Sequence, residues 1–281
     1  MTSFVFIAVL FAAACHAGWN ALIKVGLDPL SATALVALSS AVVGLAGLPV
    51  FGMPAAAAWP FLIASAFVHL FYFAALIESY RAGDLGQVYP IARGSAPLMT
   101  AGASTVFVGE PLSVASWGGI AALAAGVLLL SARGGRTLGA VDRRAVGYAL
   151  ATAITICAYS IVDGIGVRLS RNPEAYVLWL MVANAVPLVL YASWRDGKAV
   201  TVAIRRFWPR GLIGGAMQTV SYGIALWAMT LAPIAIVAAL RETSVLFGSL
   251  FAVLWLKEPL RPLRIGAALL IVCGLVLIRL Q

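Results

Sequence analysis

Charged residues are scarce in this chain. Of its 281 residues, 10% are Asp, Glu, Lys or Arg, whereas 63% are hydrophobic. A soluble domain carries about a quarter charged residues and less than half apolar ones. Too few polar side chains are present to cover a water-soluble particle, and no polar stretch is long enough to form a separate soluble domain. The composition therefore indicates a protein that is solvated by lipid.

Cysteine is rarer still, with three residues in the chain. Cys15, Cys157 and Cys273 each lie inside an apolar run without CxxC spacing. This pattern argues against a disulfide framework, and we expect the three side chains to act as small buried hydrophobic groups.

The N-terminus has no basic region before its first apolar run. A cleaved signal peptide usually has such a region, so none is expected here. We therefore interpret the first run as a retained helix.

Several functional motifs are missing as well. No GxxxxGK[ST], GxSxG or HExxH occurs, so the sequence gives no sign of ATP-driven pumping or of the common hydrolase sites. No metal or cofactor is expected. The net charge of +9 comes from Lys and Arg in short loops, which is a topology signal of membrane proteins rather than a nucleic-acid site.

Apolar runs long enough to cross a bilayer fill the chain. A hydrocarbon core needs about 20 apolar residues of helix, and turn signals such as Asp28-Pro29 and Asp196-Gly197 separate such runs. The sequence thus predicts an all-α membrane protein with ten transmembrane helices joined by short connections. The expected spans are 3–24, 30–51, 58–80, 85–107, 112–132, 145–168, 174–194, 208–230, 233–256 and 260–280.

The chain also repeats itself. A shift of 148 residues places Arg93 on Arg241 and Glu110-Pro111-Leu112 on Glu258-Pro259-Leu260. We therefore expect two five-helix repeats, at 1–137 and 138–281. Because five is odd, the second repeat should enter the membrane upside down, and such inverted repeats are typical of secondary transporters. In the fifth helix of the first repeat, Gly118, Ala122 and Gly126 predict a close helix-packing seam.

Loop charge predicts an orientation. Of the 19 Lys and Arg residues, 14 fall in or beside the loops after the odd-numbered helices and 3 on the other side, with Arg93 and Arg241 inside spans. The positive-inside rule then places both termini outside the cytoplasm. The expected location is the cell (inner) membrane, as a multi-pass protein.

Arg93 and Arg241 are the outstanding buried charges. Each lies about eight residues into its helix, roughly 12 Å deep, and the two helices enter from opposite faces. In a core of about 30 Å, both guanidiniums should approach the midplane. They could bind a substrate carboxylate or phosphonate through bidentate hydrogen bonds, or form structural ion pairs with Glu78, Asp163 or Glu242. Both interpretations stay open at this point.

Other polar side chains lie inside apolar helices, where they usually face a cavity or the bundle interior. His16, Asn20 and Lys24 share one helix face with Trp19 beside it, and His16 is a possible proton carrier. Structural hydrogen bonding is the alternative for each. The candidate cavity residues are His16, Trp19, Asn20, His69, Tyr72, Tyr89, Arg93, Tyr159, Gln218, Tyr222, Trp227 and Arg241. Glu78, Asp163 and Glu242 are possible ion-coupling residues.

The two halves, each with Glu-Pro-Leu before a glycine-marked last helix, resemble the EamA-type branch of the drug/metabolite transporter superfamily. The stretches His16–Asn20 and Ala239–Ser244 look like those of a bacterial subgroup. The resemblance implies a central cavity lined by the third, fourth, eighth and ninth helices. Members export amino acids or move sugars, nucleotide sugars or drugs. In many relatives the loop charges predict a cytoplasmic N-terminus, whereas in this chain they predict the opposite orientation.

The leading hypothesis is a secondary transporter of small polar metabolites, most of all amino acids, working by alternating access. The arginines suit a carboxylate, and the aromatic residues suit an apolar side chain. The alternatives are an intramembrane hydrolase, or a transporter of sugars, phosphonates or drugs. The expected partners are a small-molecule substrate and the lipid bilayer. Ten helices can enclose a path in a monomer, although a dimer also stays open.

Overall fold

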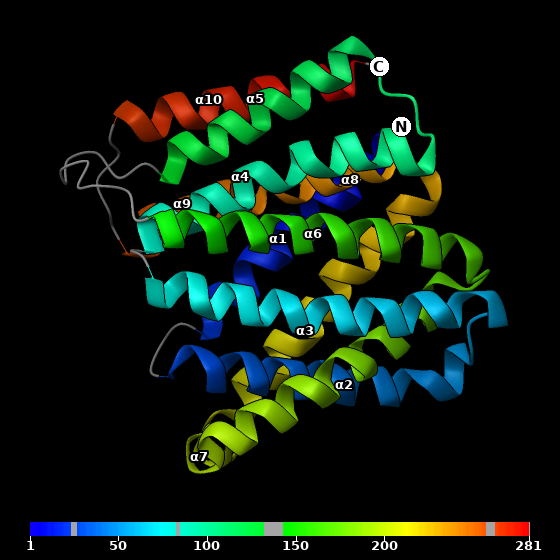
Figure 1. Cartoon of the computed structure of the whole chain (residues 1–281), viewed down its shortest axis with the longest axis vertical. Coiled ribbons are helices and arrows are strands. Elements are labelled where there is room, and N and C mark those ends of the chain that lie inside the picture. Colours follow the sequence, from blue (N-terminus) through cyan, green and yellow to red (C-terminus); the bar gives the residue numbers. More distant parts are fainter. Residues whose placement is uncertain (24–26, 83–84, 132–142, 257–261, 281) are drawn as a thin grey trace. The chain divides into compact units, whose positions relative to one another are not determined.

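The computed structural model describes residues 1–23, 27–82, 85–131, 143–256 and 262–280. These residues are almost all helical, and no strand occurs among them (Figure 1). The elements are α1 (Ser3–Ile23), α2 (Pro29–Phe51), η1 (Ala56–Ala58), α3 (Trp59–Ala82), α4 (Leu85–Ala103), η2 (Ser104–Val108), α5 (Val114–Ser131), α6 (Arg143–Leu169), α7 (Pro173–Leu231), α8 (Ile234–Arg241), α9 (Ser244–Leu256) and α10 (Pro262–Arg279).

Length and composition make these helices membrane-spanning. Seven of the described helical segments are long and apolar enough to cross a bilayer, and α5 contains a shorter apolar stretch, Val114–Leu130. Large apolar side chains also face outward, with Phe107 80% and Val114 89% exposed. Such surfaces are stable only against lipid or another protein. The all-helical membrane fold is confirmed, whereas the number of ten crossings stays a prediction.

The 59 residues of α7 contain one interruption, at Asp196 (φ −152°, ψ 74°). The Asp196 carboxylate accepts a hydrogen bond of 3.0 Å from the backbone N–H of Ala199 and so caps the second segment. The predicted turn at Asp196-Gly197 is therefore present. The expected loop before residue 208 is helical instead, because no glycine or proline breaks the run from 198 to 208.

The chain forms two compact units, and each takes segments from both halves of the sequence. The first unit comprises Met1–Leu10, Phe71–Ile161 and Leu231–Gln281, and the second comprises Phe11–Leu70 and Val162–Thr230. The units thus divide the chain differently from the two sequence repeats.

In the first unit, α5 and α10 pack antiparallel at very short range (Figure 1). A Cβ on Gly274 would lie 2.7 Å from the Gly119 carbonyl oxygen, and one on Gly126 would lie 3.0 Å from that of Ala267. The predicted seam exists, but it runs through Gly119 rather than Gly118. Position 119 is seven steps before 126, which is nearly two full helical turns, so both positions face α10. Position 118 is eight steps before 126 and is therefore rotated away from the face that contacts α10.

In the second unit, small residues let α2 approach the second segment of α7. A Cβ on Gly215 would lie 2.6 Å from the backbone N of Ser40. The Ser40 hydroxyl lies within donating distance of the carbonyl oxygen of Gly215 (3.2 Å) and of Oε1 of Gln218 (3.0 Å), and its single proton can serve either acceptor. Close backbones and interhelical polar contacts are how membrane helices associate without a hydrophobic driving force.

Asp28 starts α2 and provides a first prediction. Its carboxylate accepts from the N–H groups of Leu30 (3.1 Å) and Ser31 (3.0 Å), next to Pro29 at the first helical position. Burial raises the pKa of Asp28, but hydrogen bonds from Ser31 and Leu30 outweigh it and lower the pKa below its ordinary value. The stabilising contribution is therefore present above the unfolded-state pKa and is lost as pH falls through the folded-state pKa.

We expect Asp28→Ala to lower stability by about 1 kcal/mol, because two helix N–H groups lose their acceptor. Asp28→Asn should retain most of the stability at neutral pH, since an amide oxygen also caps. Thermal unfolding in detergent at pH 7 measures both. Equal stability of the alanine and asparagine variants would contradict the capping role.

Candidate functional site

The candidate site of the first unit is built around a break in the predicted span 233–256. The helix stops at Arg241, turns through Glu242 and Thr243, and resumes at Ser244. Arg241 lies at the carboxyl end of α8, and Glu242 lies just before the amino end of α9. The helix dipole favours a cation at the carboxyl end and an anion at the amino end, so both charges are favourably placed. Interrupted helices of this kind occur in membrane proteins where they line a cavity or are buried in protein.

The start of α8 is held by a residue from the other half of the sequence. Pro233 offers no side-chain cap. Instead Oε2 of Glu110 accepts a 2.8 Å hydrogen bond from the Ile234 N–H, and it also accepts from the Ser104 hydroxyl at the start of η2. Glu110 therefore has a structural role, because it caps the first backbone N–H of α8. Its repeat counterpart, Glu258, lies outside the described residues.

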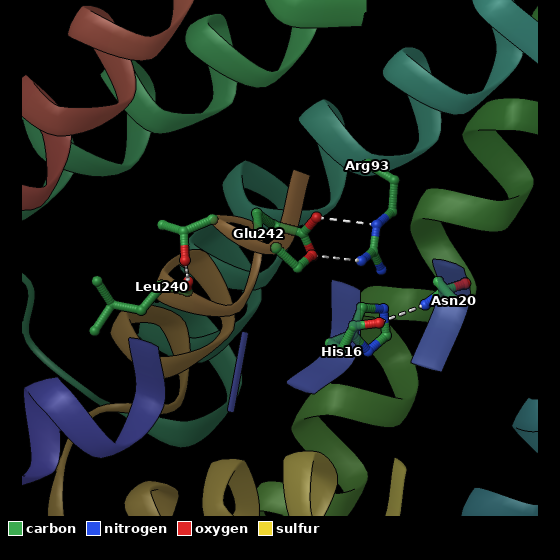
Figure 2. A network of polar contacts seen from close by, with 7 residues as sticks. His16, Asn20, Arg93, Leu240 and Glu242 are labelled. Atoms are coloured by element: carbon green, nitrogen blue, oxygen red, sulfur yellow. Dashed lines mark hydrogen bonds and ion pairs between the residues drawn. The ribbon is translucent and has the colours of Figure 1, made fainter. Parts of the chain in front are cut away.

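Arg93 and Glu242 form a buried ion pair. Nε of Arg93 lies 3.0 Å from Oε2 of Glu242, and the two side chains point toward each other in Figure 2. Arg93 and Glu242 are only 7% and 4% exposed. Nη2 of Arg93 also donates to the Ser244 hydroxyl at 3.4 Å. Glu242, one of the partners that the sequence left open for Arg93, therefore contacts its guanidinium.

Arg241 belongs to the same cluster, because both arginines interact electrostatically with the Glu242 carboxylate, Arg93 more strongly than Arg241. Arg241 and Glu242 line a small pocket with residues of α4, α6 and α8. In this conformation the pocket has room for one water molecule at most. The other lining residues are Ala96, Pro97, Thr100, Ile156, Tyr159, Ser160 and Ala238.

Aromatic residues predicted for the cavity are found here too. The ring of Tyr159, which lines the pocket, meets that of Tyr72 edge-to-face with a centroid distance of 5.8 Å. Such pairs are favourable and hold both rings in place. The pocket therefore combines a guanidinium, a carboxylate, hydroxyl groups and an aromatic wall.

A second polar cluster lies in the second unit around Asp163, which is completely buried. Its Oδ1 accepts from the Tyr176 hydroxyl (3.1 Å) and its Oδ2 from the Tyr222 hydroxyl (2.5 Å). Ser65 lies within hydrogen-bonding range of the same carboxylate, and His69 interacts with it electrostatically. Asp163, His69 and Tyr222 were predicted from sequence as separate candidates, and the fold brings them together.

The polar stripe of α1 is partly satisfied within its own helix. The Asn20 amide donates to the His16 carbonyl at 2.8 Å (Figure 2), and the His16 and Trp19 rings meet edge-to-face at 5.3 Å. Trp19 packs against Ala32 and Val36 of α2. These contacts fit the structural alternative for Asn20. Lys24 lies outside the described residues.

The remaining candidates are scattered. Gln218 contacts Ser40 of α2, while Glu78 and Trp227 are partly exposed. The side chain of Tyr89 lies outside the described residues. Among those described, no group of three His, Cys, Asp or Glu residues is placed to hold a metal ion.

Three residues of these clusters, Ser65, Tyr176 and Ser244, were not predicted from the sequence. Ser65 precedes His69 by four residues, so helical spacing could have revealed it. Tyr176 follows Pro173 at a helix start, where tyrosine is usually an interfacial anchor. Ser244 becomes a partner of Arg93 only because the helix breaks before it, and no sequence signal marks that contact.

Comparison with known proteins agrees with this fold. Residues 3–132 and 143–280 each match the EamA-like transporter family. No curated protein matches the sequence. Among solved structures 29 chains match, and one described as "Crystal structure of protein" has a TM-score of 0.77 at 20% identity, covering 99% of this chain and 96% of that chain.

At that identity the structural likeness shows the fold alone. The family match is broader, because it covers nearly all of the sequence as two repeats. Because this match covers both repeats and seven described segments can cross a membrane, the chain belongs to the EamA-like transporter family, a membrane transporter family of the drug/metabolite transporter superfamily.

Proposed function

We propose that this chain is a secondary transporter of small zwitterionic metabolites, most of all amino acids, working by alternating access. The observation that supports the substrate class is the pocket in which Arg241 and Glu242 lie beside Tyr159. A guanidinium pairs with a substrate carboxylate and a carboxylate with an ammonium group, while the tyrosine offers an apolar wall.

The small size of the pocket fits a closed conformation. An amino acid needs more room than one water molecule, so substrate binding requires the lining segments to move apart. The break between α8 and α9 is a natural place for that movement, because the turn at Glu242 and Thr243 separates two short helices. A substrate carboxylate would then take up a position near Arg241.

Uptake into proteoliposomes tests this proposal. With a panel of radiolabelled amino acids, we expect saturable uptake by the wild type. In Arg241→Ala, loss of a charge-assisted hydrogen bond worth about 1.5–3 kcal/mol should raise KM roughly ten- to a hundredfold. Arg206→Ala is the matched control, because Arg206 is exposed and contacts the Phe207 ring. Unchanged KM in Arg241→Ala would place the substrate elsewhere.

A hydrolase is the second candidate, because Oγ of Ser65 lies 3.2 Å from Nδ1 of His69 with Asp163 near by. The order of the groups favours another role. In a Ser-His-Asp triad the histidine stands between the other two, whereas here Ser65 interacts with both His69 and Asp163. Ser65 is also completely buried. A fluorophosphonate probe tests this candidate. Labelling of the wild type that is lost in Ser65→Ala would support a hydrolase.

A further inference from the structure

The two carboxylates that are buried among the described residues, Asp163 and Glu242, have different kinds of partner. Glu242 interacts with two guanidiniums, which stabilise its ionised form. Asp163 instead accepts hydrogen bonds from the neutral hydroxyl groups of Tyr176 and Tyr222. Different surroundings of this kind allow two acidic groups of one protein to serve different purposes.

The surroundings of Asp163 come from three helices. The groups that interact with its carboxylate are Ser65 and His69 of α3, and Tyr176 and Tyr222 of the two segments of α7. Arg168 follows on α6 itself, but its Nε donates to the Met229 carbonyl at 2.7 Å. Of the described side chains that interact with Asp163, only His69 is of a type whose ordinary pKa lies near neutrality.

Ser65 connects this histidine with the carboxylate. Nδ1 of His69 lies 2.9 Å from the Ser65 carbonyl and 3.2 Å from its Oγ. Because a carbonyl only accepts, Nδ1 carries a proton. The Ser65 hydroxyl can therefore accept from Nδ1 and donate to Asp163. Once the Nδ1 proton has passed to Ser65 and the Ser65 proton to Asp163, the hydroxyl can accept from the new carboxylic acid and donate to Nδ1.

We infer that Asp163, Ser65 and His69 form a proton-binding site that couples substrate movement to a proton gradient. Its role in coupling rests on the proposed transport function. A proton reaching His69 passes through the Ser65 hydroxyl to an Asp163 oxygen, which becomes a neutral carboxylic acid. Release reverses these steps. Tyr176 and Tyr222 keep both oxygens hydrogen-bonded when the acid is ionised, which limits the cost of burying that charge in a membrane protein.

Infrared difference spectroscopy of the purified wild type tests proton binding without any substrate. We expect a carboxylic-acid C=O band that changes with bulk pH, is absent from Asp163→Asn and persists in Glu242→Gln. Asparagine retains an oxygen acceptor but does not titrate in this range. An unchanged titrating band in Asp163→Asn would overturn the proton site, provided that thermal unfolding shows this variant to be folded. Tyr222→Phe, which keeps the acid, should shift the band rather than remove it.

Proteoliposomes then test coupling, using the amino acids that the wild type carries. For one proton per substrate, a pH gradient of one unit should sustain about tenfold accumulation by the wild type. We expect Asp163→Asn to lose this accumulation while retaining exchange of labelled for unlabelled substrate. Full accumulation by Asp163→Asn would overturn the coupling role. If the wild type carries no amino acid while the infrared band titrates, the proposed substrate fails and the proton site stands.

Discussion

Glu242→Ala is expected to lose about 3–5 kcal/mol of folding free energy, the largest effect of any single substitution in the candidate site. The Arg93 guanidinium is almost fully buried and would lose the carboxylate that lies 3.0 Å from its Nε. A buried cation without its counter-charge is costly because no water replaces the lost partner. Thermal unfolding of the purified variants in detergent gives the measurement.

A double variant separates the cost of a broken pair from the value of the intact one. In Arg93→Met with Glu242→Leu, both charges are replaced by apolar groups, which is often neutral or stabilising. We therefore expect the double variant to fold near wild-type stability and to fail in transport. If it were as unstable as Glu242→Ala, the pair would be needed for folding itself. Wild-type stability of Glu242→Ala would show that the pair does not form.

The second large effect is expected at Gly274. Any side chain there meets the backbone of α5, since a Cβ would lie 2.7 Å from the Gly119 oxygen and 2.9 Å from the Leu123 N. Backbone atoms cannot rotate away as side chains can. We expect Gly274→Val to cost about 1–3 kcal/mol or more by forcing α5 and α10 apart.

Gly266 offers a matched control on the same helix, because a Cβ there would meet nothing within 4 Å. Gly266→Val should therefore remain close to wild type in unfolding temperature and in the amount of folded protein recovered from membranes. Two equally damaging variants would point to helix propensity or insertion rather than to the α5–α10 contact. Two harmless variants would mean that this close approach does not exist in the membrane.

Much of the helical architecture follows from the sequence, because apolar length and turn residues are local properties. The span predicted at 145–168 corresponds to α6 at Arg143–Leu169, and that predicted at 30–51 corresponds to α2 at Pro29–Phe51. The alignment of Arg93 with Arg241 also predicted two related buried charges, of which Arg93 is buried and Arg241 is half-buried. Both arginines interact with one carboxylate in the first unit.

The helix break after Arg241 could not be predicted from the local sequence. The stretch Ala239–Ser244 contains no glycine or proline, so nothing in its propensities ends a helix. The backbone passes through this turn with tighter bonds, such as Thr243 N–H to the Leu240 carbonyl. Beside it, the Glu242 carboxylate and the Ser244 hydroxyl contact the Arg93 guanidinium. The contacts of Asp163 were equally hidden, since Tyr222 is 59 residues away along the chain and only the fold brings the two groups together.

The mixed origin of the two compact units bears on how such a chain arose. Each unit takes segments from both sequence halves, and the start of α8 in the second half is capped by Glu110 of the first. A single five-helix ancestor would have lacked the partners for these faces. In this chain each half supplies the partners that the other half lacks.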